Sequence, residues 1–155
     1  MHNTTTQKPL LFLLTVTCLF ILSGCASVRT DVIGNSDFKS YKRAYIESLA
    51  KDEFQIYSAL AFEMNDMGME VVAIQIKAPK ETDLIVKYSY EEGWDITPYL
   101  QSFQFQFIDG KTGRILATQS YKSRGIWHGV RDGRLKAAFN EFREKNGFPP
   151  SKQFN

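Results

Sequence analysis

Hydrophobic and polar residues alternate along three stretches in the second half of the chain. In residues 83–91, 100–108 and 114–122, nearly every second side chain is apolar, which is the pattern of a strand with one buried face. Between the last two stretches, residues 109–113 carry two glycines in five positions. This segment predicts a tight hairpin, whereas residues 93–98 and 123–129 predict looser loops.

The alternation also predicts which way the side chains of each strand point. The expected inward side chains are Leu84, Val86, Tyr88, Tyr90, Phe103, Phe105, Phe107, Ile115, Ala117 and Tyr121. On the opposite face we expect exposed side chains or a surface for a partner, formed by Lys87, Ser89, Gln104, Gln106, Thr118 and Ser120.

Two other segments have helical spacing. Apolar residues recur at three- and four-residue steps between Asp52 and Gly68, which is a residue typical of helix C-termini. A second helix is expected from about residue 130 to 146, before Gly147 and two prolines, with an apolar stripe of Leu135, Ala138, Phe139 and Phe142.

Strands at residues 41–49 and 70–76 flank the first helix in this interpretation. The order is then strand, helix, four strands, helix. It predicts an α+β fold: a two-layer sandwich with a mixed, mostly antiparallel sheet of about five strands and two helices on one face.

Residues 83–88, 109–117 and 148–150 resemble a family of small bacterial lipoproteins whose domain has no known function. The likeness covers about residues 38–150, and its motifs are a strand, a turn and a Phe-Pro-Pro chain end. It implies a related α/β sandwich and a place in the cell envelope, and it implies no activity.

The first 25 residues have the pattern of a secretory signal. Lys8 precedes an apolar run at residues 10–22, and Leu-Ser-Gly then leads to Cys25. We interpret residues 1–24 as a signal peptide ending in a lipobox, and Cys25 as the site that receives diacylglycerol and an N-acyl chain such as palmitate. A retained anchor helix over residues 10–28 and a cleaved signal without lipid are the alternatives, and all three place the domain outside the cytoplasm.

Residues 25–37 lack apolar periodicity and predict a lipidated cysteine with a flexible tether, followed by a single domain at 38–155. Ala26, rather than aspartate, follows Cys25. The resemblance to lipoproteins therefore implies the periplasmic leaflet of the outer membrane if the host is Gram-negative.

Composition narrows the possible functions. Without residues 1–24 the chain keeps 131 residues with 18 Lys and Arg against 17 Asp and Glu, which argues against nucleic-acid binding. Its one remaining cysteine, Cys25, would carry lipid, so the domain has no thiol for a disulfide, a metal site or catalysis.

The residues that could support chemistry are few. His128 is the single histidine of the predicted mature chain, and Asp95 or Asp132 could orient it as a general base, but no Gly-x-Ser-x-Gly motif accompanies it. Glu91, Glu92 and Asp95 could bind calcium, although they match no calcium loop. We favour a loop histidine and a solvated acidic turn, and predict no catalytic set, no metal and no cofactor beyond the lipid.

Two surfaces are candidates for binding. One is an aromatic rim of Trp94, Tyr99, Trp127 and His128, and the other is a basic patch of Lys122, Arg124, Arg131, Arg134 and Lys136. The alternatives, which we favour, are aromatic residues that cover the open edge of the sheet and an ordinary solvated loop and helix face. We therefore expect a membrane-anchored, non-catalytic binding or scaffolding module that contacts the membrane and an unidentified envelope protein or ligand. An envelope hydrolase using His128 and a carrier of a small apolar ligand are the alternatives.

Overall fold

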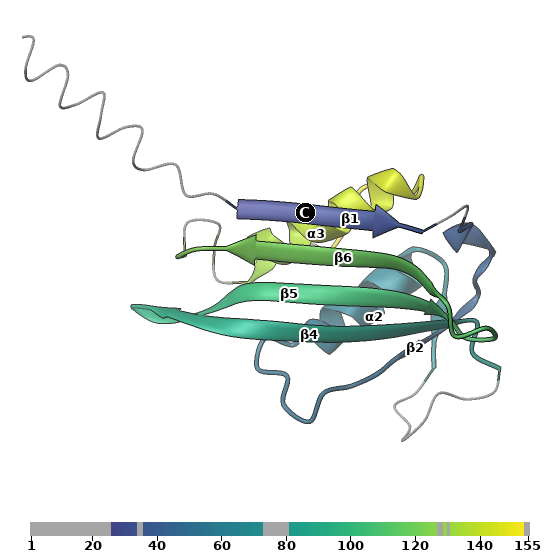
Figure 1. Cartoon of the computed structure of the whole chain (residues 1–155), viewed down its shortest axis with the longest axis horizontal. Helices are drawn as coiled ribbons and strands as arrows, with labels where there is room; N and C mark the ends of the chain where they lie inside the picture. Colours follow the sequence, from purple (N-terminus) through teal and green to yellow (C-terminus); the bar gives the residue numbers. More distant parts are fainter. Residues whose placement is uncertain (1–25, 34–35, 73–80, 127–128, 130, 154–155) are drawn as a thin grey trace, which may run out of the picture.

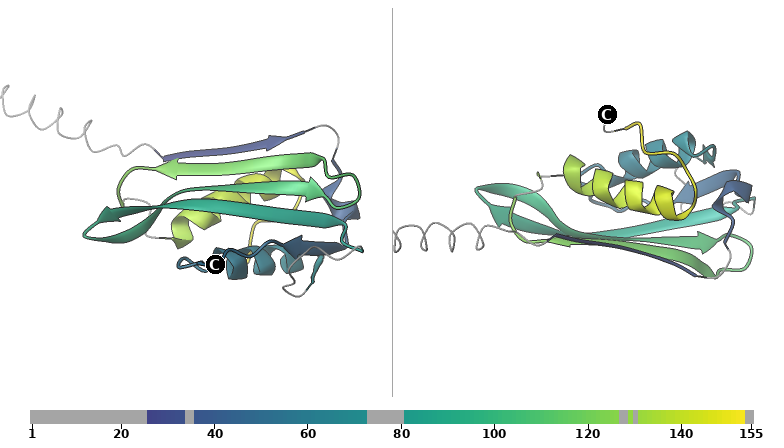
Figure 2. Two further views of the ribbon diagram at one scale, coloured as in Figure 1. Left: turned by 60° about the horizontal axis from the view of Figure 1, so that its bottom comes forward. Right: turned by 90° about the horizontal axis from the view of Figure 1, so that it is seen from above.

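The computed structural model describes residues 26–33, 36–72, 81–126, 129 and 131–153. It contains one six-stranded mixed sheet, ordered β1-β6-β5-β4-β2-β3, and two α-helices that lie on the same face of that sheet (Figures 1 and 2). The predicted two-layer α+β sandwich is confirmed, with six strands rather than about five. The elements are β1 (Ala26–Val32), η1 (Phe38–Ser40), β2 (Arg43–Ile46), α2 (Ile56–Asp66), β3 (Glu70–Val71), β4 (Leu84–Asp95), β5 (Thr97–Asp109), β6 (Ile115–Ser123) and α3 (Asp132–Lys145).

The core forms between the helices and the inner face of β4, β5 and β6. Phe103, Phe105 and Phe107 are at most 3% exposed, as their alternation predicts. The ring of Phe105 stacks on Phe103 and on Phe139 of α3, with centroids 4.7 and 5.6 Å apart. Phe107 stacks on Phe142, also from α3, at 4.3 Å. These rings pack the sheet against α3.

The first helix begins at Ile56, four residues after Asp52. The backbone N–H groups of Ile56 and Tyr57 donate to the Asp52 carboxylate at 2.8 and 2.7 Å, so Asp52 caps the N-terminus. Gly68 follows the helix with φ +88°, a conformation that glycine adopts without steric cost. The connection through α2 also leaves β2 and β3 parallel, as predicted.

The prediction of a flexible tether at residues 25–37 is wrong for most of that segment. Residues 26–32 form β1, an edge strand that pairs antiparallel with β6 from Ala26↔Ser123 to Val32↔Ala117. Two side chains of α3 bind the free backbone edge of β1: Thr30 N–H donates to Glu141 at 3.2 Å, and Lys145 Nζ donates to the Thr30 carbonyl at 2.6 Å. This segment is therefore part of the domain.

Two other expectations also need correction. Residues 93–98 are not a loose loop, because β4 and β5 stay paired through Trp94↔Pro98 and Asp95↔Thr97, with Ile96 at the tip. Ile115 is 40% exposed rather than inward, because the pairing of β5 with β6 shifts between Phe107 and Ile108. Of the strand expected at residues 70–76, Glu70–Val71 is a strand, and residues 73–76 lie outside the described part.

Candidate functional site

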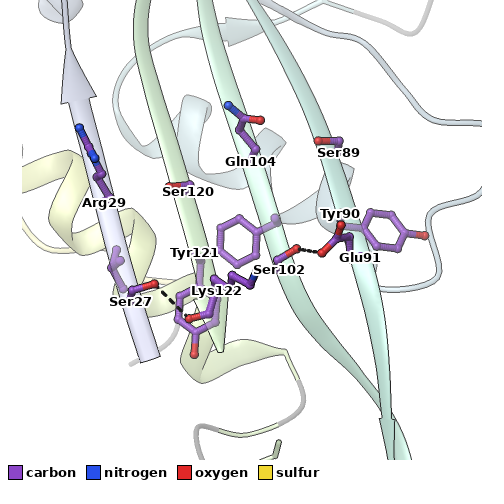
Figure 3. Close-up of a pocket in the computed structure, with 12 residues that line it drawn as sticks. Ser27, Arg29, Ser89, Tyr90, Glu91, Ser102, Gln104, Ser120, Tyr121 and Lys122 are labelled. Carbon is purple, nitrogen blue, oxygen red and sulfur yellow. Dashed lines mark hydrogen bonds between the residues drawn. The ribbon is translucent and has the colours of Figure 1, made fainter. Parts of the chain in front are cut away.

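Within the described part of the chain, no helix covers the outer face of the sheet (Figure 2). A broad hollow of about 910 Å³ lies on this face (Figure 3). One row of side chains crosses the hollow through the four neighbouring strands β4, β5, β6 and β1. Paired residues define this row as Glu91, Ser102, Lys122 and Ser27. The hydroxyl of Ser102 donates to Glu91 at 2.6 Å, and the hydroxyl of Ser27 donates to the Lys122 carbonyl at 3.4 Å.

A second row runs beside the first. It consists of Ser89, Gln104, Ser120 and Arg29, again one residue from each strand. The outward direction predicted for Lys87, Ser89, Gln104, Gln106, Thr118 and Ser120 is confirmed, because each of them is exposed or half-exposed. We call the two rows the outer-face site. Its hydroxyl, amide and mixed charged groups can exchange hydrogen bonds and ion pairs with a partner over a wide surface.

Tyr99 and Arg134 do not belong to the surfaces that the sequence predicts for them. Tyr99 is 6% exposed and Arg134 is fully buried, with its guanidinium 4.9 Å from the Tyr99 ring centroid. Arg134 donates to the carbonyls of Leu100 and Gly129 at 2.7 Å each, and to that of Gly125. Burial lowers the pKa of Arg134. This residue therefore holds the segment after β6 against β5 instead of presenting a charge to solvent.

The other members of the predicted basic patch are spread over two elements and the segment between them. Lys122 and Arg124 are exposed at the end of β6. Arg131 is half-buried, pairs with Asp132 at 2.7 Å and donates to the Gln55 carbonyl at 3.3 Å. Lys136 is half-buried on α3. The patch is thus reduced to Lys122 and Arg124 as exposed neighbours.

Three predicted residues, Cys25, Trp127 and His128, lie outside the described residues. Trp94, by contrast, is 73% exposed near the tip of the β4–β5 hairpin. Among the residues that the structure describes, no three histidine, cysteine, aspartate or glutamate side chains are placed to share a metal ion. No helix of this described part is long and apolar enough to cross a bilayer.

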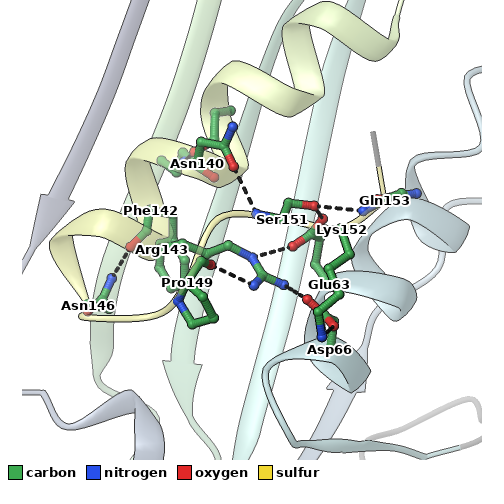
Figure 4. Close-up of polar contacts among 12 residues, drawn as sticks. Glu63, Asp66, Asn140, Phe142, Arg143, Asn146, Pro149, Ser151, Lys152 and Gln153 are labelled. Atoms are coloured by element: carbon green, nitrogen blue, oxygen red, sulfur yellow. Dashed lines mark hydrogen bonds and ion pairs between the residues drawn. The ribbon is translucent and has the colours of Figure 1, made fainter. Parts of the chain in front are cut away.

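A buried charged cluster is the main feature that the sequence does not reveal (Figure 4). Arg143 of α3 is 1% exposed, and it donates to Glu63 at 2.7 Å and Asp66 at 2.8 Å, both on α2. The second oxygen of Glu63 accepts from the Ser151 hydroxyl. Lys152 pairs with Asp66 at 3.0 Å and lowers the pKa of that carboxyl, whereas burial raises the pKa of Glu63. The cluster joins both helices to the C-terminal segment and faces away from the outer-face site.

Comparison with known proteins gives a fold rather than a family. No protein-family model matches the chain, and no curated protein matches it. A DUF4136 family protein from Bacteroides thetaiotaomicron is similar in structure, with a TM-score of 0.56, 14% identity, and 81% of this chain and 98% of the other covered. The PelC dodecamer subunit from Paraburkholderia phytofirmans has a TM-score of 0.53 and 13% identity, with 81% and 99% covered.

At these identities the likeness concerns the fold alone. The α+β sandwich that the sequence resemblance implies is nevertheless the fold that both solved structures share with this chain. Membership in the lipoprotein family stays a prediction.

Proposed function

We propose that this chain is a lipid-anchored, non-catalytic module of the bacterial cell envelope, and that it binds a partner protein through its outer-face site. The observation that carries the proposal is the position of β1. This strand forms one side of the hollow and begins at Ala26, the residue that follows the predicted lipidation site Cys25. An acyl group on Cys25 would therefore hold the outer-face site next to the membrane.

The chemistry of the outer-face site favours binding over catalysis. Its two rows contain serine hydroxyls, one amide and charges of both signs, and none of the eight residues in the rows is a histidine or a cysteine. An open hollow that spans four strands suits a protein surface better than a small molecule, because small-molecule sites are usually deep clefts that bury most of the ligand. The partner could be another copy of the chain, and the similar PelC structure is a dodecamer.

The anchoring half of the proposal is tested by mass spectrometry of the chain purified from its native membrane. The expected result is an N-terminal Cys25 carrying acyl chains, and the Cys25→Ser variant should lose membrane attachment. An unmodified Cys25, or a chain that keeps residues 1–24, would overturn this half.

The binding half is tested by site-specific photo-cross-linking in intact cells. A photoreactive residue at Gln104 samples the outer-face site, and one at Ala137, which is exposed on α3 and faces away from the sheet, is the matched control. We expect a discrete cross-linked protein product from position 104 and none of the same mass from position 137. A product of twice the chain mass would identify a second copy as the partner. Equal products at both positions, or none at 104, would contradict the proposal.

A further inference from the structure

The two most exposed large apolar side chains of the described residues lie together at one point. Trp94 is 73% exposed and Ile96 is 88% exposed, whereas the other exposed large hydrophobic residues reach at most 49%. Both lie at the tip of the β4–β5 hairpin, which extends beyond the rest of the sheet (Figures 1 and 2). Single exposed apolar residues need no explanation, but an aromatic and an aliphatic residue at the end of a protruding hairpin suggest a contact.

The hairpin tip points to the same end of the sheet as the start of β1, close to the predicted anchor. The row that contains Glu91 on β4 ends at Ser27 on β1. On β1, Ala26 lies one residue beyond this row. On the hairpin, Ile96 lies five residues beyond the row. Strands advance about 3.4 Å per residue, so the tip extends roughly 13 Å beyond Ala26.

This distance matches the polar layer of a bilayer. Headgroups add about 5–8 Å on each side of the hydrocarbon core, so if Ala26 is held within this layer, a tip that extends roughly 13 Å beyond Ala26 reaches through the headgroups to the acyl chains. Tryptophan favours that depth, because its ring is apolar and its N–H remains near water. Lys122 and Arg124, exposed beside Ala26, would face lipid phosphates, and Asp95 at the tip would oppose deeper insertion.

We infer that the hairpin tip is a second membrane contact, in which Trp94 and Ile96 insert into the lipid surface that holds the acyl anchor. The inference rests on the proposed anchoring through Cys25. Two contacts at one end of the domain would fix its orientation, with the strands upright on the membrane and the outer-face site directed sideways. A backbone φ of +63° at Ile96, where glycine or asparagine is usual, fits a tip selected for its apolar side chain.

The test uses the full lipidated chain in vesicles made with or without brominated phosphatidylcholine, since bromine on acyl chains quenches tryptophan that lies among them. The sequence has two tryptophans, so Trp127→Phe leaves Trp94 as the only one. We expect bromination to reduce the emission of Trp94 at least about twofold. Adding Ile96→Asp to this variant should weaken the quenching. If Trp127→Phe does not fold, the difference between the unmodified chain and Trp94→Phe gives the same quantity.

The outcomes separate the two proposals. A chain that floats with the vesicles while its Trp94 emission is unquenched overturns the membrane contact and leaves the anchor in place. Blue-shifted but unquenched emission also overturns it, because Trp94 would then be buried against protein. A chain that does not float at all overturns the anchor and the contact together.

Discussion

Removal of the Arg143 guanidinium should destabilise this domain more than most single substitutions. In the Arg143→Met variant a side chain of similar length replaces the cation, and the fully buried Glu63 loses its charged partner. Asp66 keeps Lys152, so Glu63 carries most of the effect. Breaking a buried ion pair in this way costs about 3–5 kcal/mol, a large share of the roughly 5–15 kcal/mol that stabilises a domain.

Urea unfolding followed by circular dichroism measures this loss. The matched comparison is the double variant Glu63→Leu with Arg143→Met, in which no charge of the pair remains buried. We expect the double variant to be more stable than Arg143→Met alone, because apolar replacement of a buried pair is often neutral. A loss below about 1 kcal/mol for Arg143→Met, or a double variant less stable than the single one, would refute the reasoning.

The pH dependence gives a second check on the same cluster. Burial raises the pKa of Glu63 in the folded chain, and the contacts with Ser151 and Arg143 oppose this rise. A carboxyl with a raised pKa contributes most stability below its unfolded pKa, and that contribution is lost as pH rises through the folded pKa. Without Arg143 the pKa of Glu63 should rise further, so the variant loses more stability than the unsubstituted chain as pH rises, and its deficit in urea unfolding should be smaller near pH 4 than at pH 7.

Substitutions at three other positions have defined outcomes. Phe105→Ala should cost about 3–5 kcal/mol in urea unfolding, because its fully buried ring stacks on two others, and an unchanged midpoint would mean that the faces of the sheet are assigned wrongly. Asp52→Ala should cost about 0.5–2 kcal/mol through loss of the helix cap, whereas Asp52→Asn should retain most of that stability. Burial raises the pKa of Tyr88 to about 12. The stability that this neutral side chain contributes to the fold is therefore complete below pH 10 and is lost as pH rises through 12. In the Tyr88→Phe variant the loss of unfolding free energy at alkaline pH should be smaller by up to about 2–3 kcal/mol. An identical pH profile of stability would exclude Tyr88 as the source of that loss.

The sequence alone determines the central hairpin and the two helices. Phe103, Phe105 and Phe107 have a two-residue period, and each occupies the inward face of β5, since burial on one side of a strand enforces that period. Asp52 and Gly68 mark the ends of α2 through local hydrogen bonding and backbone conformation, and neither effect needs the rest of the fold.

Tertiary structure decided what those local signals could not. In β1, the side chains of Val28, Thr30 and Val32 point inward at every second position, but the fully buried one is a threonine. The free backbone edge of this strand is hydrogen-bonded by Glu141 and Lys145, more than a hundred residues away in sequence. Such an edge strand has no apolar run of its own.

Tertiary contacts also decided which residues form the candidate site. Arg134 looks like a surface cation in sequence, yet its guanidinium is buried because three backbone carbonyls and two tyrosine rings from other segments surround it. The outward direction of β4, β5 and β6 in the outer-face site could be predicted from alternation, whereas that of β1 could not. Their assembly into one hollow depends on the pairing of β1, β6, β5 and β4, because only the sheet brings residues distant in sequence into adjacent rows.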